Sequence, residues 1–383
     1  MRNSNLTTKY LEISRKCTIF AKKIGRDTIK SINMKENPDL KLSIIVPVCN
    51  VEKYIRACME SIFKQGLDED IFEVIIVNDG TQDRSMEVIE DIIAQHKNIT
   101  AINQENQGIS MARNNGMAIA RGEYLLMPDP DDLLIENSVK PLLEKALETK
   151  ADMVIADFLK VEDTLFDQRY KTIQQEPSLV FNEKKGKALY LDDLVSNECY
   201  IWRTLYRRGF LIKNNISFYP GITSQDIPFT HKCYLKSIKS FKTHWLLYVY
   251  RIRQDSLSSS GTFSLEKAHD LCIAIAQTWK LKDSNNLDSR VITKLNNDVY
   301  HSFQNLLSRT IYGIDAYKDK IQVIKLLRST IPDLRFNNGI KQKIHTLLFR
   351  TSPHLYIIFL MILKKTHWHH QYKRQQSTKR NAK

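Results

Sequence analysis

The sequence lacks several features that would place it in familiar classes of protein. Its six cysteines are scattered over 383 residues without a C-x-x-C pair, which argues against a zinc site or a redox motif, and we interpret them as reduced thiols. Residues 1–41 contain no continuous apolar core of the signal-peptide type. The longest apolar run, residues 355–363, is far shorter than the about 20 residues that a membrane-spanning helix needs. We therefore expect a cytoplasmic protein in which residues 355–363 form an interfacial or buried helix.

Motifs that define several common enzyme classes are also missing. The sequence contains no G-x-x-x-x-G-K-[ST], no G-x-G-x-x-G after a predicted strand, no H-E-x-x-H and no G-x-S-x-G. P-loop hydrolases, dinucleotide-binding enzymes, zincins and α/β-hydrolases therefore lack their defining residues here.

Acidic residues are absent from the C-terminal end of the chain. Residues 334–383 carry eleven Lys and Arg, and residues 1–39 carry nine basic against four acidic side chains. The whole chain has a net charge of +14, so the body between these ends is close to neutral. Basic ends of this kind seek an anionic surface, either lipid or nucleic acid. The near-neutral body and the absence of a recognised nucleic-acid-binding motif argue against nucleic acid as the partner.

The body of the chain alternates short β-branched runs with helical patterns. Apolar side chains between the runs recur at helical spacing, as at Ile55, Met59 and Ile62. This alternation predicts an α/β fold with a mainly parallel sheet and helices on both faces. Ligands bind such sheets beyond the carboxyl ends of the strands. The predicted strands are Leu42–Val46, Val74–Val77, Ile99–Ile102, Tyr124–Met127 and Met153–Ala156.

The two ends of the chain predict helices, and the middle does not. From about residue 157 to Ser264 the periodicity is patchy, and we expect irregular structure there. Beyond Phe263, two apolar stripes predict helices, one from Ala268 to Trp279 and one from Val291 to Leu306. Residues 1–40 predict a basic amphipathic helix, which either packs against another helix, for example in a homodimer, or lies on a membrane.

An acidic triplet in Met127-Pro-Asp-Pro-Asp-Asp-Leu133 is the strongest candidate for chemistry. Residues two apart in an extended chain point to the same side, so Asp129 and Asp131 can present carboxylates to one point. Oxygen ligands without a nearby His or Cys favour Mg²⁺ or Mn²⁺ over zinc. A solvated turn with Asp132 as a helix N-cap is the alternative interpretation.

Two further segments follow predicted strands. Asp79 stands at the end of the second strand, where Gly80 allows a sharp turn. Taken alone, this segment favours a strand-to-helix turn capped by Thr81 or Asp83. Gly108 and Ser110 indicate the start of a helix, and Arg113 lies one turn further along it. An arginine in that position can meet a diphosphate or hold the acidic cluster, whereas the alternative is an ordinary surface residue.

Taken in order, these segments resemble the family 2 glycosyltransferases of bacterial capsule, exopolysaccharide and cell-wall polysaccharide synthesis. The resemblance extends over about residues 42–260, and the ordered set of motifs is more specific than any one of them. The matching segments are Ser43–Tyr54, Val77–Gly80, Asn106–Gly116, Pro128–Asp132, Trp202–Tyr206, Gly221–Phe229 and Tyr250–Arg251, with Ser256 and Ser258.

The resemblance implies the A-type glycosyltransferase fold, a Rossmann-like mainly parallel sheet followed by a helical C-terminal region. It also implies a nucleotide-diphosphate sugar as donor and Mn²⁺ or Mg²⁺ as cofactor. By position, Pro47 and Asn50 to Glu52 line the nucleotide, and Asp79 holds the base. Arg113 belongs to the same nucleotide-sugar site.

The remaining roles concern the diphosphate and the acceptor. By resemblance, Asp129 and Asp131 serve the ribose and the metal-bound diphosphate. Asp226 is then the catalytic base of an inverting transfer. The acceptor region comprises Trp202, Gln225, Tyr250 and Arg251.

Three positions depart from the family pattern. Pro130 stands where Ser or Ala is usual, Gln225 replaces a Glu before the base, and Thr204 replaces a Lys. The change at Gln225 leaves Asp226 without an adjacent like charge, and Arg203 could replace the contact that Thr204 lacks. None of these changes removes a carboxylate from the proposed mechanism.

The sequence therefore predicts transfer of a sugar from UDP-hexose or UDP-N-acetylhexosamine to a hydroxyl of a growing, lipid-linked glycan. An inactive scaffold of the polysaccharide assembly and a nucleic-acid-binding protein are the alternatives, and metal-dependent hydrolysis of a UDP-sugar distinguishes the enzyme from both. We predict four segments: the N-terminal helix at 1–40, the catalytic domain at 41–262, a helical region at 263–340 and a basic tail at 341–383. The catalytic domain divides into a nucleotide-sugar half at 41–157 and an acceptor half at 158–262. The basic tail is expected to associate with the inner face of an anionic membrane.

Overall fold

The structure of the protein is a computed structural model, and its chain forms two compact units. The N-terminal unit ends at Arg253, and the C-terminal unit follows it. The predicted helix at residues 1–40 lies almost wholly outside the described residues, as do Ser256, Ser258 and the end of the basic tail. The structure describes residues 40–165, 179–194, 198–253, 263–283, 287–336 and 339–364.

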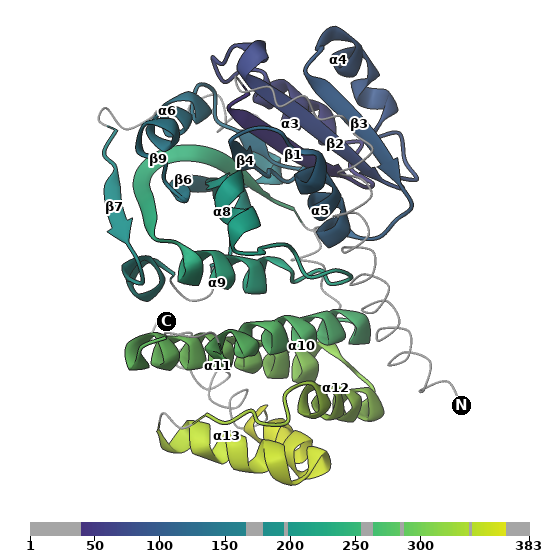
Figure 1. The fold of residues 1–383 in the computed structure, drawn as a ribbon. Coiled ribbons are helices and arrows are strands. Elements are labelled where there is room, and N and C mark those ends of the chain that lie inside the picture. Colours follow the sequence, from purple (N-terminus) through teal and green to yellow (C-terminus); the bar gives the residue numbers. More distant parts are fainter. Residues whose placement is uncertain are drawn as a thin grey trace, which may run out of the picture. The chain divides into compact units, whose positions relative to one another are not determined.

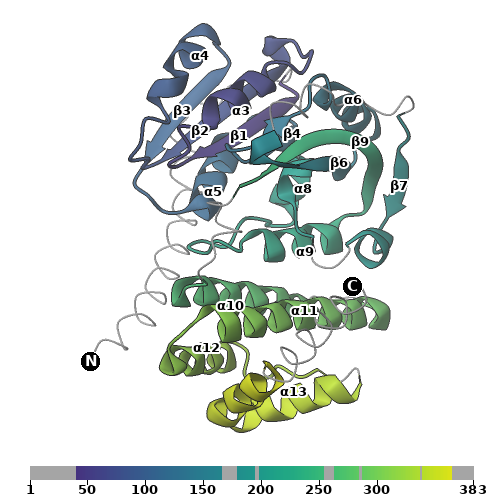
Figure 2. The same ribbon diagram turned by 180° about the vertical axis from the view of Figure 1, so that it is seen from behind.

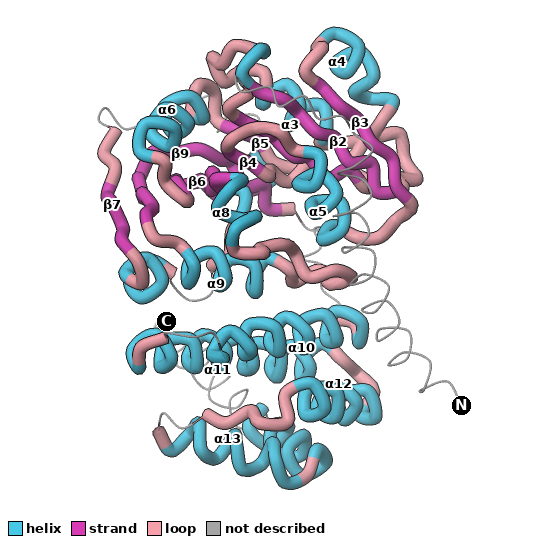
Figure 3. The backbone as a smooth tube through the Cα atoms, viewed as in Figure 1, coloured by secondary structure: helices cyan, strands magenta, loops and turns pink. Residues whose placement is uncertain are grey.

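A mixed sheet forms the centre of the N-terminal unit (Figures 1 and 3). Its strands follow the order β3-β2-β1-β4-β8-β6-β9-β5, and β7 pairs with β9. The first four in this order run parallel, and β8 pairs antiparallel with both of its neighbours. The strands are β1 (Leu42–Val48), β2 (Phe72–Asp79), β3 (Ile99–Gln104), β4 (Tyr124–Leu126), β5 (Leu133–Leu134), β6 (Met153–Glu162), β7 (Asn182–Lys185), β8 (Thr204–Arg207) and β9 (Lys239–Ile252).

Helices cover both faces of this sheet, because alternate side chains of the buried strands point to opposite faces (Figure 2). Leu42, Ile44 and Val46 of β1 join one core cluster with apolar residues of α3 and α6. On the other face, a Cβ at Gly116 of α5 would lie 2.4 Å from Ile45, so only glycine allows α5 to approach β1 so closely. The helices of this unit are α3 (Ile55–Ile62), α4 (Glu90–Gln95), α5 (Ile109–Ile119), α6 (Val139–Thr149), α8 (Arg208–Lys213) and α9 (Asp226–Lys236).

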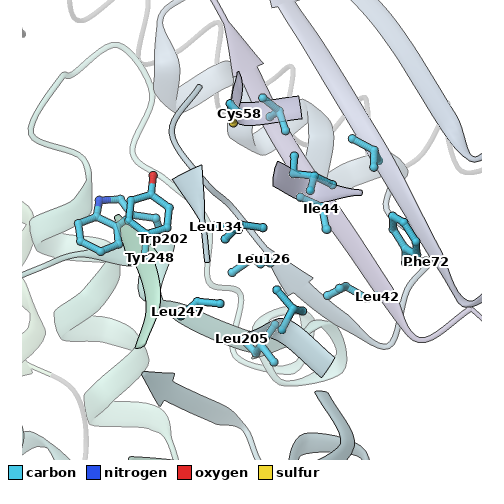
Figure 4. Close-up of a cluster of buried hydrophobic side chains, with 14 of the residues drawn as sticks. Leu42, Ile44, Cys58, Phe72, Leu126, Leu134, Trp202, Leu205, Leu247 and Tyr248 are labelled. Carbon is cyan, nitrogen blue, oxygen red and sulfur yellow. The ribbon is translucent and has the colours of Figure 1, made fainter. Parts of the chain in front are cut away.

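The core cluster extends from the parallel strands to the antiparallel half of the sheet (Figure 4). It runs from Phe72 and Leu42 through Leu126 to Trp202 and Tyr248, all of them buried. This continuous core fixes the loop after β4 relative to β9. Both contribute to the site described below.

All five predicted strands are confirmed in position. Strands β1, β2, β3 and β6 extend beyond their predicted ends, and β4 ends one residue earlier than predicted. The prediction of irregular structure between about residue 157 and Ser264 is wrong for β8, α8, α9 and β9. The 14-residue strand β9 was missed because it mixes exposed, half-buried and buried positions without a simple alternation, as at the consecutive buried residues Leu247, Tyr248 and Val249.

The described part of the C-terminal unit is helical. The predicted stripes are confirmed as α10 (Leu265–Trp279) and α11 (Ser289–Gly313), and α12 (Tyr317–Thr330) follows. Helices continue beyond residue 340, as α13 (Ile340–Thr351) and a further helix at 353–364. None of the helices in the described ranges is long and apolar enough to cross a membrane.

Candidate active site

The loop after β4 brings three carboxylates together. One carboxylate oxygen from each of Asp129, Asp131 and Asp132 lies within 4.8 Å of the others, and this is the one such cluster of potential metal ligands found among the described residues. The loop leaves the sheet where β4 pairs with β1 on one side and β8 on the other. The placement agrees with the expectation that ligands bind beyond the carboxyl ends of parallel strands.

Asp132 has a structural role in this cluster. Its side chain is buried, and its two oxygens accept hydrogen bonds from the Tyr248 hydroxyl (2.9 Å) and the Arg251 backbone N–H (2.7 Å). The same hydroxyl accepts from the Asp129 backbone N–H at 2.9 Å. The interpretation of a solvated turn with Asp132 as an N-cap is therefore wrong, because the residue is buried and the next helix, α6, has Ser138 at its N-cap.

Two arginines neutralise the other carboxylates. Arg113, buried in α5, donates to Oδ1 of Asp129, and Arg253, just after β9, donates to Oδ2 of Asp131 through Nε (3.0 Å) and Nη2. Arg113 is thus not an ordinary surface residue. Burial raises the pKa of Asp129, and the charge of Arg113 opposes that rise.

These bonds leave one oxygen on each of the two outer aspartates. Oδ2 of Asp129 and Oδ1 of Asp131 accept no hydrogen bond from the described residues, whereas both oxygens of Asp132 are occupied. Hard divalent cations such as Mg²⁺ and Mn²⁺ prefer carboxylate oxygens. The donor set therefore fits such a cation, with Asp129 and Asp131 as ligands and Asp132 as the residue that positions the loop.

Asp79 ends β2 and is buried at the same edge of the sheet. Its Oδ1 accepts from the Gln104 side chain (2.7 Å) and from the Gln107 backbone N–H (2.8 Å). Gly80 follows with φ +65°, and a Cβ there would lie 2.9 Å from the Asn106 backbone nitrogen. The turn holds Asp79 in place and leaves its Oδ2 without a hydrogen bond from the described residues.

The loop after β1 is tied to the loop after β2. The Asn50 side-chain oxygen accepts from the Gln82 backbone N–H at 2.9 Å, and the Glu52 backbone N–H donates to Asp83 at 2.9 Å. Partial burial would raise the pKa of Asp83, but hydrogen bonds from Ser85, Glu52 and Thr81 lower it to about 2.

These contacts give two adjoining loops one fixed shape. Asn50 is exposed, Glu52 is half-buried, and Pro47 is buried within β1. The predicted nucleotide-binding residues therefore lie at one edge of the sheet, together with Asp79.

Asp226 is the first residue of α9 and is half-buried. Burial raises the pKa of its carboxyl to about 6, although the charge of Arg113 acts in the opposite direction. Its Oδ1 accepts from the Ile227 backbone N–H at 3.0 Å. The charge of Asp129 raises the same pKa further, so Asp226 lies close enough to the acidic cluster to be affected by it.

The other predicted acceptor residues lie beside the cluster. Trp202 stacks on Tyr248 with ring centroids 4.1 Å apart and on Tyr250 at 5.8 Å, and the first of these stacks is visible in Figure 4. Arg251 donates to the Asp131 backbone oxygen (3.2 Å) and pairs with Asp163 (2.7 Å). These contacts make a stack of buried and half-buried aromatic rings that continues into the acidic cluster.

Positions that depart from the family pattern are all buried. Gln225 leaves its Oε1 buried without a hydrogen-bond partner in the described residues. Thr204 is inside β8, and the guanidinium of Arg203 lies over the Phe158 and Tyr200 rings at 5.6 and 5.8 Å. Arg203 therefore packs against this stack of aromatic rings.

Sequence reasoning missed Asp132, Tyr248 and Arg253 as site residues. Arg253 lies two residues after Arg251, so recognising β9 would have placed both on the same side of an extended chain. Both guanidinium groups also lie over the Tyr54 ring, at 5.0 and 4.6 Å.

The fold agrees with that of solved glycosyltransferases. The chain superposes on the structure of Staphylococcus aureus TarS 1-349 in complex with UDP-GlcNAc with a TM-score of 0.66 and 19% identity, over 86% of this chain and 92% of that one. The predicted fold class, the A-type glycosyltransferase fold, is confirmed.

Sequence comparison finds one family model that matches part of the chain. Residues 43–211 match the model "Glycosyl transferase family 2". Bacillus subtilis EpsJ, described as an uncharacterized glycosyltransferase, is 34% identical over 57% of this chain and 62% of its own length. Glycosyltransferase GlyA of Streptococcus pneumoniae is 32% identical over 58% of this chain and 32% of its own length. The chain thus matches between about one third and two thirds of the length of these relatives.

Proposed function

We propose that the protein transfers a sugar, with inversion, from a nucleotide-diphosphate sugar to a hydroxyl of a bacterial surface polysaccharide. The observation that carries this proposal is the pairing of Asp129 and Asp131, each with one oxygen left for a ligand, together with the half-buried Asp226 and its raised pKa. The UDP-GlcNAc complex of TarS supports UDP-hexose or UDP-N-acetylhexosamine as the donor.

The donor would lie along the edge of the sheet that carries the two tied loops. Asp79 would accept a hydrogen bond from the base through Oδ2, and Pro47, Asn50 and Glu52 would line the nucleotide. Because these loops are already held by hydrogen bonds, little ordering would be required when the nucleotide binds. Arg113 would keep Asp129 ionised next to the diphosphate.

Asp129 and Asp131 would hold Mn²⁺ or Mg²⁺. When bound, such a cation stabilises the negative charge of the departing diphosphate. Arg251 and Arg253 lie next to these carboxylates and would add positive charge on the same side.

Asp226 would accept the proton of the acceptor hydroxyl. A carboxylate whose pKa is about 6 is ionised at neutral pH and is also a stronger base than an exposed aspartate. A positioned base of this kind contributes roughly 10² to 10⁴ in rate. The acceptor sugar would lie against the half-buried Tyr250, whose ring stacks on the buried Trp202, near Gln225 and Arg251.

The acceptor is proposed to be a glycan linked to a membrane lipid. The enzyme would then work at the cytoplasmic face of an anionic membrane, either alone or as a homodimer. The basic residues from 334 to 383 motivate this placement, because each Lys or Arg near an anionic surface contributes about 1 kcal/mol.

A screen of nucleotide-sugar donors for hydrolysis, with and without Mn²⁺, tests the proposed function. We expect release of UDP from one UDP-sugar, dependent on Mn²⁺ or Mg²⁺. Binding of UDP-sugars without any turnover in the presence of metal and glycan acceptors would instead indicate an inactive scaffold. An absence of nucleotide binding would contradict the donor site itself.

A further inference from the structure

Helix α13 carries an apolar stripe on its solvent side. Ile340, Ile344 and Leu347 recur at spacings of four and three residues, and Ile340 and Leu347 are 79% and 63% exposed. The opposite side of the helix is buried through His345 and Phe349. Helix α13 therefore has one face packed against the protein and an opposite apolar face that is exposed.

The helix at 353–364 repeats this pattern. Tyr356 and Ile357 are fully buried, and the Tyr356 hydroxyl lies 2.7 Å from Nδ1 of His345 in α13. Its exposed side carries Leu355, Ile358 and Ile362, again at helical spacing. Exposed apolar residues at helical spacing on two consecutive helices indicate an interaction site rather than scattered surface residues.

Basic residues border the stripe of α13. Lys343 and Arg350 are exposed, lie seven residues apart and follow one border of the stripe, and exposed Lys341 follows the other. No acidic residue occurs in the sequence from 334 to 383. An apolar stripe between basic borders is the pattern of a helix that lies in the interface of an anionic bilayer.

A cavity of about 390 Å³ opens beside these helices, between α11, α13 and the helix at 353–364. Leu307, Ile311, Leu360 and Leu363 contribute apolar walls. Lys341 and Lys364 supply positive charge at the same cavity. Such a cavity suits an anionic lipid, because the apolar walls can contact the acyl chain and the two ammonium groups can pair with the negatively charged headgroup.

We infer that α13 and the helix at 353–364 form a bilayer-docking surface for anionic phospholipid. The surface is defined by Ile340, Lys341, Lys343, Ile344, Leu347, Arg350, Leu355, Ile358 and Ile362. The inference rests on the proposed function, because a surface of this kind would bring the enzyme to a lipid-linked acceptor.

A second copy of the chain is a poorer occupant. A two-fold interface brings the same surface of both copies together. The borders of the docking surface are basic, and the sequence from 334 to 383 offers no acid to pair with them, so a symmetric contact would place like charges opposite each other. An anionic bilayer has the complementary charge.

Vesicle sedimentation with the full-length protein tests the docking surface. We compare wild type, Leu347→Asp and Ile358→Asp on vesicles of phosphatidylcholine with phosphatidylglycerol and on phosphatidylcholine alone. Each Asp should lower the partition coefficient by about tenfold or more, since an apolar group leaves the lipid and a negative charge approaches an anionic surface. Ile212→Asp in α8 is the matched control, because Ile212 is 62% exposed but lies in the N-terminal unit, and it should bind as wild type.

Further measurements on the same preparations separate the possible failures. Lys341→Gln with Lys364→Gln should remove most of the preference for phosphatidylglycerol.

Unchanged vesicle binding of Leu347→Asp and Ile358→Asp would overturn the inference and assign the anchor to another part of the chain. Absence of vesicle binding, with a dimer that Leu347→Asp dissociates, would overturn it in favour of a second copy. UDP-sugar hydrolysis without lipid should stay within about twofold in these variants, so a wild type that binds vesicles but never hydrolyses a donor would contradict the proposed function alone.

Discussion

The site contains two kinds of carboxylate, and they differ in their partners. Asp129 and Asp131 are each paired with an arginine, and Asp132 accepts two hydrogen bonds. Asp226 accepts hydrogen bonds from the backbone N–H groups of Ile227 and of Asp226 itself, and burial raises its pKa to about 6. Burial raises the pKa of Asp129 as well as that of Asp226, so the two kinds of carboxylate differ in their partners, an arginine beside Asp129 and backbone N–H groups beside Asp226.

The comparison shows how one residue type serves two steps of a reaction. A carboxylate that must hold a cation benefits from permanent charge and a fixed position. A carboxylate that must accept a proton benefits from a pKa close to the working pH. The difference arises from the local partners, because all four aspartates come from loops or helix starts of the same unit.

The largest effect is expected for Asp226→Asn. Asparagine keeps the size of the side chain but is not basic, so transfer should fall by roughly 10² or more while donor affinity stays within about twofold. Transfer rate and donor affinity are measured on one preparation. Asp91→Asn, which removes an exposed carboxylate paired with Arg56, is the control and should leave both unchanged.

A structural role for Asp226 would give a different result. If the residue only supports the start of α9, the Asn variant would show a lower melting temperature with near-normal transfer. That outcome would place the base elsewhere and remove the contrast between the two kinds of carboxylate.

Asp131→Asn should affect binding rather than proton transfer. The amide keeps the shape but loses the charge that would hold a cation, so we expect Mn²⁺-dependent affinity for the UDP-sugar to fall by at least about tenfold. Calorimetry with and without Mn²⁺ measures this loss. Equal affinity in the variant and the wild type would contradict the role of Asp131 as a ligand.

The pH dependence of transfer tests the raised pKa of Asp226, and the pH dependence of donor affinity tests the raised pKa of Asp129. Because the pKa of Asp226 is raised to about 6, the base is ionised above that pH, and the transfer rate should fall about tenfold per unit below it. A profile of kcat against pH checks this expectation. A flat profile down to pH 5 would contradict it.

The same raised pKa has a consequence for stability. The folded protein binds the Asp226 proton more tightly than the unfolded chain does, so the ionised carboxylate destabilises the fold at neutral pH, and this penalty disappears as pH falls through about 6 towards 3.8. The Asn variant should therefore melt at the same or a higher temperature than the wild type at neutral pH. A clear decrease would indicate that hydrogen bonds to the charged form dominate.

The smallest effect is expected for Tyr248→Phe. The hydroxyl donates to Asp132 and accepts from the Asp129 backbone, so its loss should destabilise the loop by about 1 to 3 kcal/mol and weaken donor binding several-fold. Tyr124→Phe is a matched control, because its buried hydroxyl donates to the backbone oxygens of Ala146 and Ala151 instead. We expect Tyr124→Phe to lose a similar amount of stability but to keep its donor affinity. The weaker donor binding of Tyr248→Phe would then come from the loss of its contacts in the site and not from lower stability.

The sequence predicted the parts of the site that follow the parallel strands. The β-branched runs located the strands, and the rule for strand ends then placed Asp79 and the acidic triplet at one edge. Asp132 could not be assigned, because its buried role depends on Tyr248 and Arg251 from β9, more than a hundred residues later. Strand β9 has no regular alternation, so neither its position nor Arg253 beside Asp131 could be derived from local patterns.

Parallel calorimetry of UDP binding in the presence of Mn²⁺ tests the central claim most directly. Wild type, Asp131→Asn and Asp226→Asn are compared under one set of conditions. The account predicts that Asp131→Asn loses at least about tenfold in affinity while Asp226→Asn stays within about twofold of the wild type. Equal losses in both variants, or no loss in either, would contradict the division between carboxylates that bind and a carboxylate that acts as the base.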